Sequence, residues 1–501
     1  MSNFIQRNNS LIRLSCLLAG IVILSVNLYV YRGYNVDDTY IPLRYADNYN
    51  RTGDLSFNPG ERILGFTSYL HMGFLLLESG MGLAPFSLIR CMTVLSALAL
   101  VFSLFCWERK LVNKTSALVL APILMSLYYP VALWGQTPLE SMVLVFLLFQ
   151  AGMYAVFGSF QKWGRLNWIC CMTGVMALRP EGFLAGVLFW GMVCVRSVMP
   201  KGRLLRMLLI NLIPLAVLFG WFWYYYGSPV PNTFQAKTGS VFLMVRRGLG
   251  DYFHHFQAFW PAYIGGFGVL IAAWRHGLRT RASLFLAGTQ VVAACYVLYV
   301  GGDWMPGFRF ILLQVPFFIL LVCILWHDMP SPAFKLISMA LIFCGLILTL
   351  PFRFRVATPM DPGAPFVAEY IKLHKNAGDQ MAIWDVGIIP RQAEIYTIDL
   401  GGLNSRKIVR EFPRGYHFNR YDPGTAQRFA DSLLSWRPRY IVLKEKDGKI
   451  THEGIGVQLD RSAEFHALYK RLPLEQKSIY GIYETEESRN GFREEGGKHK
   501  R

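Results

Sequence analysis

Long apolar runs separated by short polar loops fill the first 350 residues of the chain. About 20 consecutive apolar residues are enough to cross a bilayer, so runs near that length predict transmembrane helices. About eleven such runs occur, near residues 11–31, 86–106, 116–133, 139–157, 166–178, 183–198, 207–226, 258–273, 283–300, 309–326 and 333–350. The pattern therefore predicts a polytopic α-helical membrane protein.

Two apolar stretches need a separate interpretation. The first run follows Arg7 and Arg13, and no small-residue cleavage site comes after it, so we interpret it as a retained anchor. Residues 64–82 are also apolar, but Glu78 and three glycines weaken them as a span. We expect a juxtamembrane or re-entrant helix there, inside a first outer loop over residues 32–85.

Composition and charge placement support this topology. The chain is 53% hydrophobic and 16% charged, which is too apolar for an ordinary soluble enzyme. Its net charge of +18 would suit nucleic acid, but much of that charge lies in alternate short loops between the apolar runs. Basic loops mark the cytoplasmic side, so we expect a cytoplasmic N-terminus, the lipid bilayer as a partner, and no nucleic acid.

A second kind of pattern begins after about residue 355. Charge becomes dense, and strand-like runs at 381–385, 395–398, 440–443 and 479–483 alternate with helical runs at 365–375 and 425–436. An odd number of spans precedes this region, which places it on the outer side. We therefore expect a membrane domain over 1–354, a small α/β domain over 355–485, and a disordered tail over 486–501.

The first outer loop carries two adjacent carboxylates, Asp37 and Asp38. Like charges raise each other's pKa, and a carboxyl group of raised pKa can accept a proton from a sugar hydroxyl. The pair can also cap a surface helix, where the positive N-terminus favours anions. Arg44, a few residues on, either pairs with an Asp or binds a lipid phosphate through its guanidinium fork.

The other predicted outer loops add polar groups to the same face. Asn232 and Lys237 suit sugar hydroxyls and an anionic phosphate, whereas the tyrosines before them suit an interfacial aromatic belt. Structural ion pairs and substrate contacts both remain open for the remaining four outer-loop residues, which are Arg179, Glu181, Asp303 and Arg309. The nine cysteines form no C-x-x-C spacing, disulfide framework or zinc pattern, so no metal site is assigned.

Several motifs on this face resemble one known family. They are Asp-Asp-Thr-Tyr-Ile-x-x-Arg-Tyr-Ala from residue 37, Phe-Asn-Pro-Gly-Glu-Arg from 57, Arg-Pro-Glu-Gly from 179, Tyr-Tyr-Gly-x-x-x-Pro-Asn-Thr-Phe-x-Ala-Lys from 225, Gly-Gly-Asp-Trp-Met-x-Gly-x-Arg from 301, and two short runs at 385–387 and 398–404. Together they are similar to the terminal arabinofuranosyltransferases, GT-C glycosyltransferases of the actinobacterial arabinan type with Gram-negative relatives that arabinosylate type IV pilin. One departure is Gln136, where relatives often carry a glutamate, with Glu140 further on.

The resemblance implies a GT-C fold in a bacterial inner membrane, with the α/β domain in the periplasm. It implies a polyprenyl-phosphate sugar donor, typically of D-arabinofuranose, used on a glycan or pilin acceptor at that face. It makes one Asp of the pair catalytic, and Asp38 is preferred because it lies further from the span. Arg44, Lys237 and Arg309 are then candidates to stabilise the departing phosphate. No cofactor is assigned, and a divalent cation is left open.

Two alternatives remain. The same architecture can move another lipid-phosphate sugar, such as mannose or aminoarabinose. A lipid-linked saccharide transporter is the alternative from another class, but it predicts charges within the spans and function on both faces. The polar motifs here gather on one predicted face, which favours the transferase.

Overall fold

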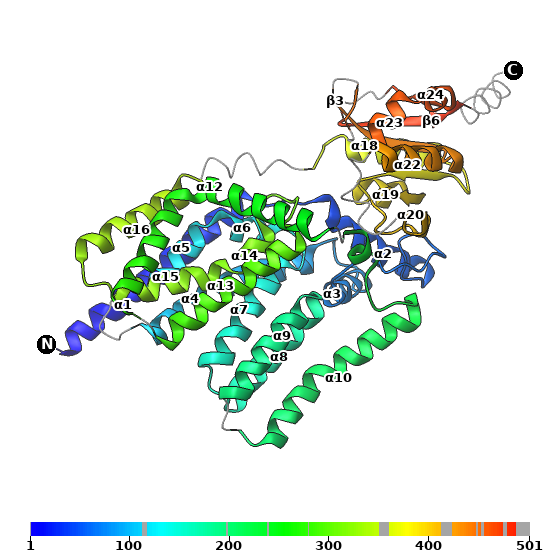
Figure 1. Cartoon of the computed structure of the whole chain (residues 1–501). Coiled ribbons are helices and arrows are strands. Elements are labelled where there is room, and N and C mark those ends of the chain that lie inside the picture. Colours follow the sequence, from blue (N-terminus) through cyan, green and yellow to red (C-terminus); the bar gives the residue numbers. More distant parts are fainter. Residues whose placement is uncertain are drawn as a thin grey trace.

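Figure 1 shows the protein as a computed structural model, in which a long body of helices carries a small sheet domain at one end. The structure describes residues 2–112, 118–196, 199–237, 240–278, 280–349, 360–411, 423–446, 449–451, 455–473 and 478–486. The N-terminus lies at the end of the helical body furthest from the sheet domain (Figure 1). The predicted tail over 486–501 lies outside the described residues, apart from residue 486.

Among the described residues, five helices are long and apolar enough to cross a membrane. They are α1 (Ser2–Val30), α4 (Ser87–Leu111), α10 (Lys201–Tyr226), α12 (Val241–Arg275) and α13 (Arg281–Val300). Shorter helices complete the body: α7 (Ser141–Phe157), α8 (Lys162–Leu178), α9 (Gly182–Arg196), α15 (Val315–His327) and α16 (Pro332–Ile347). Large apolar side chains such as Val217 and Trp223 are exposed on α10, as expected where a helix faces lipid.

Two of the predicted spans are broken. Residues 116–133 do not form one helix, because α5 (Ala121–Leu127) and α6 (Tyr129–Gln136) are separated by an extended Tyr128. A proline stands in the first turn of each, where its missing N–H costs no helical hydrogen bond. The predicted span at 309–326 likewise divides into α14 (Arg309–Leu312) and α15. The single-helix prediction was wrong at both places.

The apolar stretch at 64–82 is a short helix, α3 (Tyr69–Gly80), that packs near α2 (Tyr40–Thr52). Its 12 residues are too few for a span. Glu78 is buried and accepts hydrogen bonds from the backbone N–H groups of Phe86 (2.5 Å) and Leu88 (2.7 Å), at the start of α4. The carboxylate that weakened this stretch as a span therefore stabilises the N-terminus of the next helix.

In its described residues, the C-terminal domain contains a six-stranded mixed sheet in the order β2-β1-β3-β6-β5, with β4 paired to β3. The strands are β1 (Gln380–Ile383), β2 (Tyr396–Asp399), β3 (Tyr440–Lys446), β4 (Lys449–Ile450), β5 (Tyr469–Arg471) and β6 (Tyr480–Thr485). Its helices are α18 (Ala364–His374), α19 (Ile388–Ala393), α20 (Arg406–Glu411), α22 (Pro423–Trp436), α23 (Ile455–Arg461) and α24 (Ala463–Leu468). All four predicted strands and both predicted helices are present.

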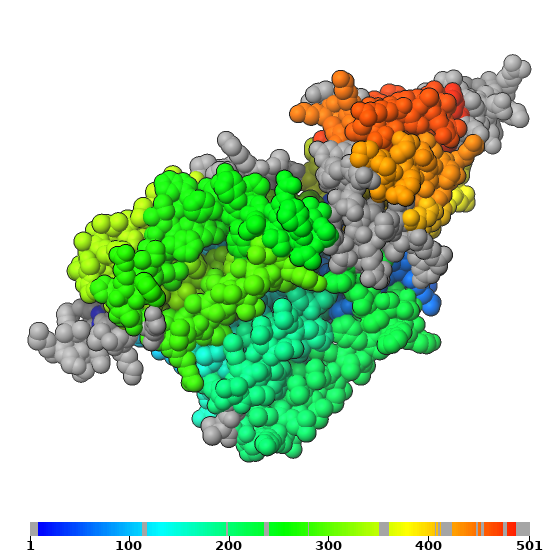
Figure 2. All heavy atoms as spheres, viewed as in Figure 1, coloured from blue at the N-terminus to red at the C-terminus, as the bar shows by residue number. Residues whose placement is uncertain are grey.

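The sheet domain packs against the first loop, residues 32–85. One apolar core joins Tyr45, Phe57 and Phe66 of the loop to Val367 and Ile389 of the domain. In the space-filling view the orange and red domain stands at one end of the helical body, close to blue atoms of the N-terminal part of the chain (Figure 2). The first loop therefore lies between the two parts of the molecule, with part of its surface exposed.

Candidate active site

Asp37 lies where the first loop meets the C-terminal domain. It begins a short 3-10 helix, η1 (Asp37–Thr39), directly before α2. Its carboxylate accepts hydrogen bonds from the backbone N–H groups of Gly387 (2.7 Å) and Ile388 (3.0 Å), at the start of α19. Asp37 therefore does act as a cap, but for a helix of the other domain rather than for its own.

A second carboxylate faces this group. Burial raises the pKa of Asp37 to about 7, and the nearby charge of Asp385 raises it further than that of Asp38 does. Asp385 accepts a hydrogen bond from the Tyr480 hydroxyl (2.7 Å) and forms an ion pair with Lys444 (2.5 Å). We call Asp37, Asp385, Lys444 and Tyr480 the junction site. The sequence predicted like-charge repulsion between the adjacent residues Asp37 and Asp38. In the structure the stronger repulsion is between Asp37 and Asp385, across the two domains.

Arg44 is buried at the same junction, only 5% exposed. Its guanidinium donates to the carbonyl oxygens of Phe57 (2.8 Å) and Ile395 (2.7 Å) and to the side chains of Asn58 and Thr397 (both 3.2 Å). These four acceptors are all protein groups. The geometry therefore gives Arg44 a structural task, which is to tie the first loop to β2, instead of the phosphate contact considered from the sequence.

Asn232 also binds the C-terminal domain. Its side-chain amide donates to the carbonyl oxygens of Gly402 (2.7 Å) and Leu403 (3.1 Å), and its backbone N–H donates to Leu64 of the first loop (2.7 Å). It begins the short helix α11 (Asn232–Lys237). The side chain of Lys237 lies outside the described residues.

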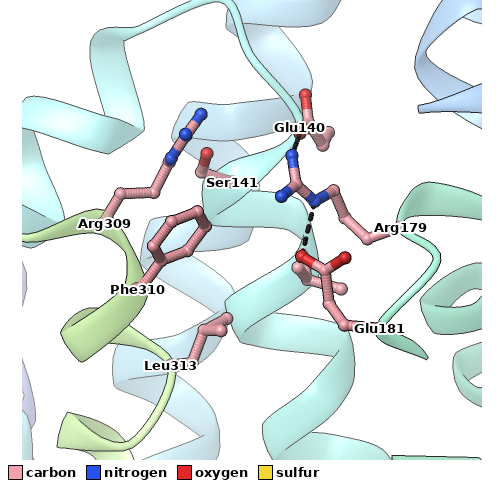
Figure 3. A pocket seen from close by; sticks show the side chains of 8 residues that line it. Glu140, Ser141, Arg179, Glu181, Arg309, Phe310 and Leu313 are labelled. Atoms are coloured by element: carbon pink, nitrogen blue, oxygen red, sulfur yellow. Dashed lines mark hydrogen bonds and ion pairs between the residues drawn. The ribbon is translucent and has the colours of Figure 1, made fainter. Parts of the chain in front are cut away.

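A separate polar centre lies between helices of the body, where a small pocket of about 10 Å³ is just large enough for one water molecule. We call it the interhelix pocket. Arg179 donates to Glu181 (2.7 Å) and to Glu140 (3.0 Å), so its guanidinium lies between two carboxylates. Figure 3 shows this arrangement, with Arg309 and Phe310 reaching in from the opposite side.

Further side chains extend this cluster. The Tyr296 hydroxyl donates to Glu181 (2.7 Å), and the buried His71 lies 3.7 Å from Glu140. Asp303 and Arg309 form an ion pair of 2.8 Å, as the first of the two sequence hypotheses for them proposed. The structure thus brings the 179–181 and 303–309 motifs together and adds Glu140, which the sequence analysis noted only as a glutamate that follows the departure at Gln136.

Arg90 links the two centres. Its guanidinium donates to Asn35, two residues before Asp37 (2.9 Å), and to the carbonyl oxygen of Gln136 (3.1 Å), the last residue of α6, which precedes the loop that leads to Glu140. Sequence reasoning missed Arg90 because it lies near the start of an apolar helix, outside every loop motif. A basic residue in the first turn of a predicted span was the available signal, since such residues need a polar partner.

Within the described residues, no three His, Cys, Asp or Glu side chains lie together in a geometry that could hold a metal ion. The divalent cation left open by the sequence thus has no such cluster in this part of the chain.

Three comparisons with known proteins complete the description. A search of curated proteins found no match to the sequence. Residues 360–487 match DUF8728, a domain of unknown function. Among solved structures, ArnT from Cupriavidus metallidurans bound to undecaprenyl phosphate matches with a TM-score of 0.55 and 10% identity, over 94% of this chain and 97% of that chain.

Two further structures are similar. ArnT in the apo state has a TM-score of 0.52 and 11% identity, over 94% of this chain and 97% of its own. The arabinofuranosyltransferase AftD from Mycobacteria has a TM-score of only 0.44 and 12% identity, over 93% of this chain and 41% of that chain. The chain has the GT-C fold. With its long apolar helices it is a multi-pass membrane protein, and the fold predicted from the sequence is confirmed.

Proposed function

We propose that this protein is a glycosyltransferase that moves a pentofuranose, D-arabinofuranose, from a polyprenyl phosphate to a glycan or pilin acceptor. The reaction takes place at the periplasmic face of the bacterial inner membrane. The fold shared with ArnT, which is bound to undecaprenyl phosphate in one structure, supports the lipid-phosphate donor. The motif resemblance to arabinofuranosyltransferases supports the sugar.

The observation that carries the proposal is the position of the Asp37 carboxylate, which the backbone N–H groups of Gly387 and Ile388 hold at the junction of the two domains. Its pKa is raised to about 7, so the carboxylate can accept a proton at neutral pH and release it again. In the proposed step the acceptor hydroxyl gives its proton to Asp37, and its oxygen forms a bond to the anomeric carbon. The bond from that carbon to the phosphate oxygen breaks, and the polyprenyl phosphate leaves with the electron pair.

The charge that develops on the leaving phosphate needs cations. Arg309 remains in this role, with Arg179 beside it across the interhelix pocket. Lys237 also stays in the proposal, on the strength of its motif alone. Arg44 is left out, since its donors already serve protein acceptors.

The other motif residues have supporting roles in this proposal. Asp38, which the sequence favoured as the catalytic residue, is kept as a second carboxylate that holds the acceptor hydroxyl, and Asp37 takes the role of proton acceptor in its place. Glu181 and Asp303 keep the two arginines in place through their ion pairs, and Asn232 fixes the loop that carries Lys237.

The test is transfer by the purified protein from labelled polyprenyl-phosphate arabinofuranose, with mannose and aminoarabinose donors supplied in parallel. The variant Asp37→Asn should reduce the rate by about 10² to 10⁴, which is the usual contribution of a general base. The matched control is Asp47→Asn, which removes a carboxylate of the same loop that forms a partly exposed ion pair with Arg391.

Three outcomes contradict the proposal in different ways. Full activity of a folded Asp37→Asn variant would show that Asp37 is not the general base. Transfer from another donor but not from arabinofuranose replaces the sugar. Movement of intact lipid-linked saccharide across vesicles, without transfer, makes the protein a transporter.

A further inference from the structure

The matched domain of unknown function reaches the proposed reaction centre through its own residues. Gly387 and Ile388 donate hydrogen bonds to the Asp37 carboxylate, and Asp385 is the like-charged neighbour that raises the pKa of Asp37 most. We propose that the C-terminal domain is a working part of the reaction centre, and that Asp385 is a positioning residue that acts through Asp37. This inference rests on the proposed function.

The approach of the two domains at this point leaves no space for a side chain. A Cβ atom on Gly387 would collide with the backbone oxygen and the carboxylate of Asp37. The glycine is therefore required by contact across the junction and not by a left-handed backbone, because its φ is −89°. Any residue other than glycine has to push Asp37 away from its present position.

The charged and polar side chains around Asp37 come from both the first loop and the C-terminal domain. Asp38 lies beside it in η1, and Asp385 faces it from the loop after β1. Lys444 of β3 and the Tyr480 hydroxyl of β6 both bind Asp385. Asp361 of the same domain lies near Tyr480 and accepts a hydrogen bond from Ser478. The cation of Lys444 thus contacts Asp385, whereas the hydrogen bonds that Asp37 receives from described residues of the C-terminal domain come from neutral backbone N–H groups.

This division of partners gives Asp385 a function. An ionised carboxylate held beside Asp37 favours the protonated form of Asp37, because two close negative charges repel. The amide donors of Gly387 and Ile388 act in the opposite direction and hold the carboxylate in one orientation. The C-terminal domain therefore sets both the position of the proton acceptor and the pH at which it takes up a proton.

The junction is also fixed by contacts remote from Asp37. The Asn58 side chain pairs with both the N–H and the C=O of Thr397, each at 3.0 Å. The Tyr45 hydroxyl donates to Asn404 (3.0 Å), and Arg44 donates to Ile395 (2.7 Å). All of these partners are buried, so a network of polar contacts binds the domain to the first loop in addition to its chain connection.

Two variants test the inference with the full-length protein. Asp385→Asn keeps the size of the side chain and removes its charge, so the acid limb of the pH–rate profile should move down by about 1 pH unit. Gly387→Ala should lower kcat at least tenfold, while KM for the lipid donor stays within about twofold, since the donor phosphate is bound elsewhere. The control is Gly73→Ala in α3, where a Cβ meets no atom within 4 Å.

The outcomes separate this inference from the proposed function. An active Asp37→Asn variant means that the proposed base is wrong. An inactive Asp37→Asn variant, together with an unmoved acid limb in Asp385→Asn, overturns the inference and leaves the proposed function standing. A purely structural Asp385 would lower stability without moving the limb. If Gly387→Ala does not fold, the position of the acid limb in the pH–rate profile of Asp385→Asn alone decides whether the inference holds.

Discussion

The junction site and the interhelix pocket place different charges beside their carboxylates. At the junction, burial and the facing carboxylate of Asp385 raise the pKa of Asp37 to about 7, while the two backbone N–H groups that bind Asp37 act in the opposite direction. In the pocket, Glu140 and Glu181 both bind the guanidinium of Arg179. The first arrangement lets a proton come and go near neutral pH, whereas the second keeps its carboxylates ionised.

The difference separates the tasks that a sugar transfer requires. A proton acceptor needs a pKa near the working pH, and a leaving phosphate needs fixed positive charge. The two centres are joined by Arg90, which binds the loop of Asp37 on one side and the loop of Glu140 on the other. Breaking one centre should therefore have a different consequence from breaking the other.

The largest effect on stability is expected from Arg179→Met. The substitution leaves Glu140 and Glu181 without their shared cation, and their side chains are only 6% and 20% exposed. Removing one partner of a buried ion pair costs about 3 to 5 kcal/mol. Thermal unfolding in detergent should show a large fall in Tm. Adding Glu140→Gln to the same protein should recover part of it, and a wild-type Tm in the single variant would contradict the charge arrangement.

A smaller effect is expected from Arg44→Lys at the junction. Lysine keeps the charge but cannot reach the carbonyl oxygens of Phe57 and Ile395 and the Asn58 side chain together. The loss of hydrogen bonds from a buried cation should cost about 2 kcal/mol. Donor KM should stay unchanged, measured in the transfer assay. A rise in donor KM without loss of stability would instead indicate that Arg44 binds the donor phosphate.

The smallest effect is expected from an ion pair at the solvent-exposed edge of the junction, which we call its rim. Arg51 pairs with Glu394 at 3.0 Å, but the two side chains are 50% and 39% exposed. Exposed ion pairs contribute less than about 1 kcal/mol. Arg51→Ala should therefore leave both Tm and the transfer rate close to those of the wild type. A loss comparable to that of Arg44→Lys would show that the junction depends on its rim rather than on its buried contacts.

The fold followed from the sequence wherever a pattern was local. Apolar length predicted the helical body, and short strand-like runs predicted the four longer strands. The break at Tyr128 was not predicted although Pro130 is a local signal for it, because a proline ends or kinks a helix that precedes it. The sequence does not show the distant contact made there, in which the Tyr128 hydroxyl bonds to His255 of α12 at 2.7 Å. Strands β4 and β5 were missed because runs of two or three residues are too short to be recognised as strands.

The site followed from the sequence only in part. Asp37 was identifiable as a costly charge beside a span, but its partner Gly387 is 350 residues away in the chain. Arg44 was considered for phosphate because a sequence does not show which donors the backbone already uses. Glu140 and Arg90 were missed as members of the site for the related reason that their partners belong to other loops.

The dependence of the transfer rate on pH tests the central claim most directly. Asp37 must be deprotonated to accept the acceptor's proton, so kcat/KM should rise with pH through an apparent pKa of about 7 and level off above it. The profile is measured with the purified protein and labelled polyprenyl-phosphate arabinofuranose. An acid limb near 7 supports Asp37 as the proton acceptor. A rate that is already constant at pH values well below 7 would contradict it.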